Sequence, residues 1–170
     1  YSHTNDPDNF VGTGAGSIVL EDQVVGLASF RSDLIIFCKN SIFKLLNIND
    51  SNSIVVQPVT KNVGCMDAQS IQEIAGDLLF LSPDGLRTVA GTVRIGDVEL
   101  GTVSRPIQPT IKSIAANIDN LDITSAVLRS KSQYRLFYNT DGTANAASKG
   151  VIATLTNEGF QYSETLGIKA

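Results

Sequence analysis

A strand–turn–strand motif recurs along the chain, and this repetition restricts the fold more than any other feature of the sequence. Residues 33–45 (DLIIFCKNSIFKL) align without gaps with residues 77–89 (DLLFLSPDGLRTV), 44 positions later. Residues 134–142 (YRLFYNTDG) align with the second copy at its Asp-Gly pair, 57 positions further on. A self-match at a nearly constant spacing is typical of repeat architectures.

Each copy is an apolar run, a polar turn and a second run, which is the pattern of a β-hairpin. The turn pairs are Asn-Ser at 40–41 and Asp-Gly at 84–85 and 141–142. These residue types can adopt the positive φ angles of a tight hairpin turn. We expect the apolar flanks of these turns to be buried on both faces, as in the stacked blades of a propeller.

Further short β-rich runs, separated by polar residues, glycines and prolines, extend over most of the chain. The predicted strands are 17–20, 24–30, 34–38, 42–46, 54–59, 71–74, 78–81, 86–89, 92–95, 123–128, 134–138, 151–156 and 159–163. Many short strands indicate an all-β sandwich, barrel or propeller. A repeat of 44 residues, stretched by insertions to 57, favours a propeller, whose blades run to about 40–50 residues.

We therefore expect an all-β fold of propeller-like blades built from short antiparallel strands. The approximate repeats are 17–62, 63–117 and 118–170, within residues 1–170 as a single domain or a fragment of one. Because a closed propeller typically has at least about four blades, the sequence predicts an incomplete propeller.

One segment has helical rather than strand periodicity. Its isoleucines are spaced by four, three and four residues, at Ile107, Ile111, Ile114 and Ile118. Because Pro109 disfavours a helix that runs through it, the spacing predicts a short helix over residues 110–117, with Thr110 near the N-cap. This helix is expected to be a packed connector between blades.

The charge balance argues against tight nucleic-acid binding. The 170 residues include 13 Lys and Arg against 17 Asp and Glu, a net charge of −4, and 42% of residues are hydrophobic. A protein that holds DNA needs clustered cations, whereas a mildly acidic surface lets a polyanion slide past. No apolar run reaches the roughly 18 residues of a membrane span, so none is predicted.

Residues able to do chemistry are scarce. His3 is the sole histidine, and Cys38 and Cys65 are expected to be reduced structural thiols. The GTGAG run at 12–16 lacks the dinucleotide-binding pattern. The candidate carboxylates lie mostly in or beside turns, where Asp bonds its own backbone: Asp77, Asp84, Asp97, Glu99, Asp119, Asp122 and Asp141.

The run SPDG at 82–85 is superficially similar to the Asp-box hairpin of sialidases, but it lacks the residue between Asp and Gly and the closing Trp. A hairpin turn is the simpler interpretation. We therefore predict no catalytic, cofactor-binding or metal-binding residue, and no enzyme activity.

Arg129, Lys131 and Arg135 form the one local basic cluster, in and just before a predicted strand. They are candidates for contact with a DNA channel or with an acidic neighbouring subunit. The alternative is a solvated strand face or rim.

A series of short motifs, in this order, resembles one known family. The motifs are Ser2, DPDNF at 6–10, VVGLASFRSDLIIF at 24–37, NSIFKL at 40–45, VGC at 63–65, GDLLFLSPDGL at 76–86 and VSRPI at 103–107. They resemble the β-propeller tail tubular or nozzle proteins of short-tailed bacteriophages, and the related head-completion or stabilisation proteins. The resemblance covers residues 1 to about 110, whereas 120–170 resembles only a generic blade.

The resemblance implies a virion structural protein in the phage tail, assembled in the cytoplasm of the bacterial host. Its partners would be further copies in a ring around the DNA-exit channel, an adaptor or portal protein above, and tail fibres or spikes at the side. Genomic DNA would pass without sequence-specific binding. The chain is shorter than a complete propeller of this kind and lacks the expected platform and tip domains.

Two other functions remain open. The first is a carbohydrate-binding or glycan-cleaving propeller of a spike or secreted protein. The chain has no Trp, and the strand phenylalanines are expected in the core: Phe37, Phe43, Phe80 and Phe137. The second is a cellular propeller for protein–protein interaction.

Overall fold

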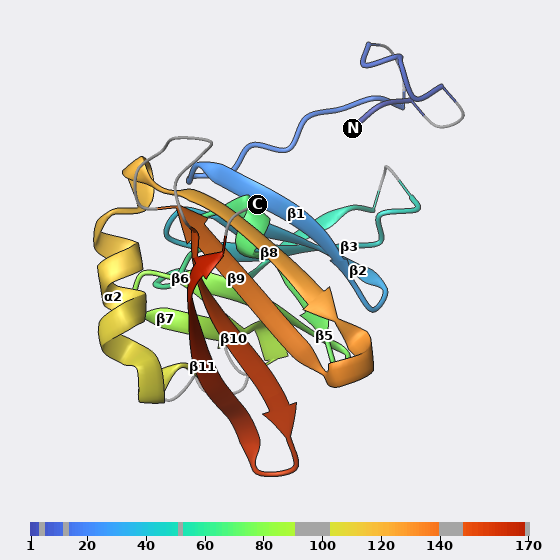
Figure 1. Cartoon of the computed structure of the whole chain (residues 1–170). Coiled ribbons are helices and arrows are strands. Elements are labelled where there is room, and N and C mark those ends of the chain that lie inside the picture. Colours follow the sequence, from blue (N-terminus) through green and yellow to red (C-terminus); the bar gives the residue numbers. More distant parts are fainter. Residues whose placement is uncertain (4–5, 12–13, 51–52, 91–102, 140–147, 169–170) are drawn as a thin grey trace.

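The computed structural model describes residues 1–3, 6–11, 14–50, 53–90, 103–139 and 148–168. This part of the chain is mostly β, with antiparallel sheets and one short α-helix, as predicted (Figure 1). The predicted division into repeats remains a prediction.

The strands form three antiparallel sheets, each from consecutive strands joined in chain order. The first sheet contains β1 (Val24–Phe30), β2 (Asp33–Cys38), β3 (Ile42–Leu46) and β4 (Val55–Thr60). The second contains β5 (Gln72–Ile74), β6 (Asp77–Ser82) and β7 (Gly85–Thr88). The third contains β8 (Asp122–Leu128), β9 (Gln133–Asn139), β10 (Ser148–Thr156) and β11 (Gly159–Ile168).

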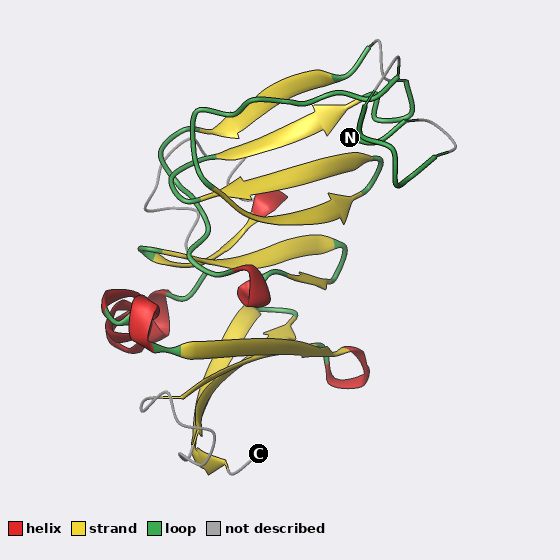
Figure 2. Ribbon diagram, turned by 90° about the horizontal axis from the view of Figure 1, so that it is seen from above, coloured by secondary structure: helices red, strands yellow, loops and turns green. Residues whose placement is uncertain are grey.

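The three sheets stack face to face, with the second sheet in the middle (Figure 2). Side chains of β6 alternate between two apolar clusters. Leu78 and Phe80 pack against Phe37 of the first sheet, whereas Leu79 and Leu81 pack against the third sheet around Leu136. The middle strand is therefore buried on both faces, as its uninterrupted apolar run indicates.

A segment that we call the 63–72 connector runs between the first and second sheets. The amide of Cys65 donates to the carbonyl oxygen of Cys38 in β2, at 2.9 Å. The backbones approach so closely that a Cβ atom on Gly64 would lie 2.2 Å from the carbonyl oxygen of Lys39. Only glycine permits this contact.

The same connector also bonds to the second and third sheets. The amide of Met66 donates to the carbonyl of Leu81 at 2.9 Å, and the amide of Leu81 donates to Oγ of Ser70 at 3.1 Å. The hydroxyl of Tyr134, in β9, donates to the carbonyl of Ser70 at 2.9 Å. Burial raises the pKa of Tyr134 well above its ordinary value.

The helix α2 (Gln108–Ala116) begins earlier than predicted. Pro109 lies in its first turn, where a helix needs no N–H donor, so the proline starts the helix instead of delaying it. Thr110 is therefore inside the helix, and Ile107 is the N-cap. The helix packs on β7 through buried Ile111 and Ile114.

The predicted strand at 17–20 is wrong. Residues 17–20 form no ladder, and Ile18 and Leu20 instead cover the outward face of the first sheet, near Ile36. The predicted strand at 92–95 and the predicted turn at 141–142 lie outside the described residues.

The predicted turn positions also need correction. The β6–β7 turn is Pro83-Asp84, and Gly85 pairs with Ser82 at the start of β7; Gly85 does have the predicted positive φ, at 149°. Asn40 and Ser41 do not use positive φ; their turn is held by the carboxylate of Asp22, which accepts from the Asn40 amide at 2.7 Å and from Oγ of Ser41 at 2.7 Å. The turns at residue 31 and at 75–76 do use positive φ, with values of 58° at Arg31 and 52° and 74° at 75–76.

The Tyr134 hydrogen bond gives the first prediction. Tyr134→Phe leaves the buried Ser70 carbonyl without this donor and should lower the free energy of unfolding by about 1–3 kcal/mol. Tyr138→Phe is the control, because no hydrogen bond is made by its hydroxyl within the described residues, and it should change stability by less than about 0.5 kcal/mol. Urea unfolding followed by circular dichroism measures both, and equal effects would contradict the assigned role.

Candidate interaction surfaces

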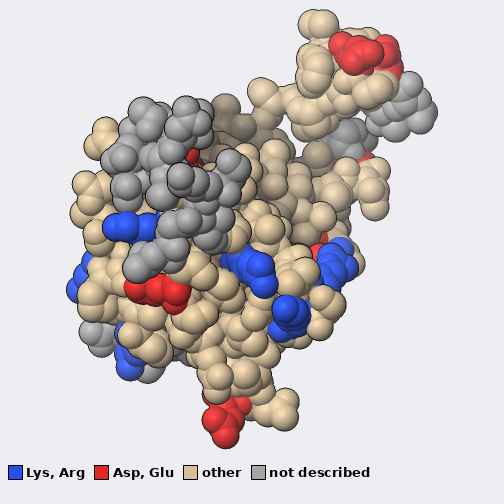
Figure 3. Space-filling view, viewed as in Figure 1, with Lys and Arg blue, Asp and Glu red and all other residues tan. Residues whose placement is uncertain are grey.

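The predicted basic cluster lies in the β8–β9 hairpin. Arg129 and Lys131 belong to the short 3-10 turn η4 (Arg129–Lys131) and are exposed. Arg135 is half-buried in β9, where its guanidinium donates to Oε1 of Gln133 at 2.8 and 3.2 Å. On the face in Figure 3, basic side chains lie over this hairpin. Contact of the cluster with DNA or a subunit remains a prediction.

A second surface is formed where the first strands of the three sheets meet; we call it the first-strand edge. It consists of β1, the 3-10 turn η1 (Ala68–Ser70), β5 and β8. Gly26 of β1 faces Ala68 and Ile71, so closely that a Cβ on Gly26 would lie 2.8 Å from Cδ1 of Ile71. On the other side, Ser125 of β8 donates to the carbonyl of Gln69 and accepts from Nε2 of Gln72, the latter at 3.2 Å.

The first-strand edge carries no cation within its elements. Its only charged residues are Glu73 in β5 and Asp122 in β8, and both are exposed. Arg31 and Arg129 lie just beyond the ends of β1 and β8, and Arg135 of β9 pairs with Ala126 of β8. Within the elements of the first-strand edge, the exposed charges are therefore negative.

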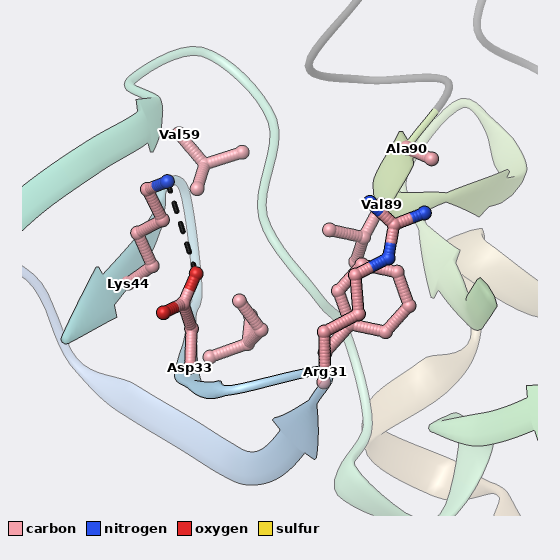
Figure 4. A pocket seen from close by; sticks show the side chains of 8 residues that line it. Arg31, Asp33, Lys44, Val59, Val89 and Ala90 are labelled. Carbon is pink, nitrogen blue, oxygen red and sulfur yellow. Dashed lines mark ion pairs between the residues drawn. The ribbon is translucent and has the colours of Figure 1, made fainter. Parts of the chain in front are cut away.

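A third feature is a pocket of about 240 Å³ between the first sheet and the residues that follow β7; we call it the Arg31 pocket (Figure 4). Its walls are apolar and consist of Phe30, Ile35, Val59, Val89 and Ala90.

Three charged side chains surround the Arg31 pocket. Nζ of Lys44 lies 3.9 Å from Oδ2 of Asp33. The guanidinium carbon of Arg31 lies 4.9 Å from the ring centroid of Phe30, an arrangement typical of a cation–π contact. Figure 4 shows Arg31 extending toward Val89 on one side, with Lys44 and Asp33 on the other.

Asp84, in the SPDG turn, neutralises a buried arginine. Arg87 is 1% exposed, and its Nε donates to Oδ1 of Asp84 at 3.1 Å, while Nη2 donates to Oδ2. Ser82 donates to the same carboxylate at 2.6 Å. Burial acts to raise the pKa of Asp84, but the bonds from Arg87 and Ser82 and the charge of Arg87 outweigh it, so the pKa lies below its ordinary value.

The aromatic residues divide between core and surface. Phe37 and Phe80 are fully buried against each other, with ring centroids 5.2 Å apart, as predicted. Phe43 is half-buried in the cluster on the outward face of the first sheet.

The prediction that Phe137 lies in the core is wrong. It is half-buried and pairs with Thr124 and Gly150, on the face of the third sheet that points away from the stack. The sequence of β9 does not reveal the outward position of Phe137, because the apolar run continues through it. Tyr134 and Leu136 occupy the side of β9 that faces the core. The cross-strand neighbours of Phe137 include no carboxylate of the kind that glycan hydrolysis requires.

Residues that could bind a metal form no cluster in the parts of the chain that the structure covers. Cys38 and Cys65 are buried free thiols; burial raises the pKa of both, that of Cys65 to about 11. His3 lies in the N-terminal segment, which extends away from the sheets in Figure 1. Among the described residues, no group of three or more His, Cys, Asp or Glu is placed to hold a metal ion. None of the described helices has the length and apolarity to cross a membrane.

Comparison with known proteins adds no assignment. No protein-family model matches this chain, and no curated protein matches it.

The Asp84–Arg87 pair gives the second prediction. Asp84→Asn leaves the buried guanidinium without its anion and should lower the free energy of unfolding at neutral pH by about 1.5–3 kcal/mol. Because the pKa of Asp84 is lowered on folding, its contribution is present above its ordinary value of 3.8 and is lost as pH falls through the folded value. The stability of the wild-type chain should therefore fall more steeply than that of Asp84→Asn below about pH 4.

Thermal unfolding at several pH values measures this difference, with the exposed Asp119→Asn as the control. Parallel pH profiles of stability for the wild-type chain and Asp84→Asn would show that the Asp84–Arg87 pair does not cause the loss of stability at low pH.

Proposed function

We propose that this chain is a β-propeller-type structural protein of a short-tailed bacteriophage tail. In this proposal the three sheets are blades, and copies of the chain assemble in a ring around the channel through which DNA leaves the virion. The adaptor or portal protein would lie above the ring, and fibres or spikes at its side. No enzymatic step and no cofactor enters the proposal.

One structural observation supports the proposal that the three sheets are propeller blades. Three antiparallel meanders follow each other in the chain, stack face to face and each begin at the first-strand edge. Propeller blades repeat in this way around an axis, with each chain segment running outward from the first strand and returning for the next blade. The order of sequence motifs that resembles the phage nozzle proteins lies largely in the first two of these sheets, together with the N-terminal residues.

The charge distribution supports the assignment to a conduit. The chain has a net charge of −4, and the elements of the first-strand edge hold no Lys or Arg. Arg129 and Lys131 are confined to one turn. A component of a DNA channel has to guide the duplex without retaining it, and this requires few phosphate contacts.

The third prediction concerns assembly. Electron microscopy of the purified protein, or of virions that contain it, should show a closed ring of subunits with an axial channel wide enough for duplex DNA. In a companion measurement at low salt, the protein should show no tight binding of duplex DNA.

Isolated monomers with no position in a particle would contradict the proposal and favour recognition of sugars or cellular proteins. Tight binding of DNA at low salt would contradict the role of a non-adhesive conduit wall.

A further inference from the structure

The Arg31 pocket has an excess of positive charge. Lys44 and Asp33 face each other at 3.9 Å, so this carboxylate is matched by one cation. The second cation, Arg31, forms no ion pair with a carboxylate of the described residues and rests on the ring of Phe30. A ligand that complements this pocket therefore carries an anionic group, such as a carboxylate, next to an apolar group.

The backbone fixes Arg31 at this position. It occupies the β1–β2 turn with φ of 58°, a conformation that costs a residue with a side chain roughly 1 kcal/mol or more. Phe30 and Asp33 pair across the turn, so the hairpin geometry holds the arginine at the mouth of the pocket. The backbone therefore places Arg31 beside the pocket, and the contact with the Phe30 ring orients its guanidinium.

The chain itself presents a complementary group at the tip of the β10–β11 hairpin. Pairing between β9 and β10 ends at Thr154, whereas β10 and β11 continue to the pair Thr156–Gly159. The tip carries exposed Glu158, which forms no ion pair with a cation of the described residues. Figure 1 shows this hairpin projecting beyond the other strands, and Figure 3 shows acidic surface at its end.

Apolar side chains lie directly behind this carboxylate. Leu155 and Phe160 form a half-buried cross-strand pair at the base of the tip. The hairpin therefore combines an acid with apolar surface, as the pocket requires. The hairpin cannot enter its own pocket, because the third sheet lies on the opposite side of the second sheet from β1–β4 (Figure 2).

We propose that the Arg31 pocket binds the β10–β11 hairpin tip of a second copy of this chain, with the Glu158 carboxylate against the Arg31 guanidinium. The two surfaces differ, so the contact is head-to-tail; repeated contacts of this kind close into a ring or extend as a filament. This inference rests on the proposed function and names the contact between neighbouring subunits of the ring.

The test reverses each charge and then exchanges them. Sedimentation velocity at rising protein concentration should show assembly of the wild-type chain at low salt. Arg31→Glu and Glu158→Arg should each weaken assembly by roughly tenfold or more, because like charges then face each other. The double variant carrying both changes should restore assembly, since the pair is present again with its charges exchanged.

Matched controls make the same charge changes outside both surfaces. Lys112→Glu on α2 and Glu21→Arg before β1 alter exposed residues and should leave assembly unchanged. Circular dichroism of each variant confirms that the fold is retained.

The outcomes separate the contact from the wider proposal. A wild-type chain that assembles, with Arg31→Glu and Glu158→Arg assembling equally well, overturns this contact and leaves a ring built through other surfaces. Failure of the double variant to recover, with both single variants folded, also overturns it. A wild-type chain that stays monomeric at every concentration overturns the contact and counts against self-assembly itself.

Discussion

The arrangement of the three sheets depends on the 63–72 connector, whose backbone is bonded to each of them. Cys65 is held by β2, Met66 by β6, and Ser70 receives the hydroxyl of Tyr134 from β9. These groups are buried, and a buried donor or acceptor left unpaired costs about 1–3 kcal/mol. Face-to-face apolar packing alone would allow the sheets to slide, whereas these directional bonds fix their relative position.

The charged groups lie at the margins of this stack rather than within it. Arg129, Lys131 and Glu158 are in turns, and Arg31 is in the turn that opens the pocket. The buried exception, Arg87, is neutralised by Asp84 inside one hairpin. The result is an apolar core whose charged groups, apart from Arg87, lie in turns or at positions that are not fully buried.

The sequence predicts the local structure correctly where the pattern of apolar residues alone determines it. The apolar runs locate β2 and β6, and the run at 24–30 coincides with β1, because residues suited to paired strands recur there at short spacing. Errors occur where tertiary contacts decide. Residues 17–20 have the composition of a strand but no partner strand. Phe137 lies in an apolar run, but the residues of that run on the opposite side of β9 are the ones that pack in the core. The basic cluster is recognisable in the sequence because it is local, whereas the Arg31 pocket joins residues of the first sheet to residues after β7, and no linear spacing reveals it.

Native-state hydrogen exchange tests the role of the connector most directly. The amides of Cys65, Met66 and Leu81 donate to partners across the connector, so they should exchange as slowly as the most protected amides of β6 and only through global unfolding. Rapid exchange of the connector amides, with the sheets still protected, would contradict this role and show that apolar packing alone holds the sheets together.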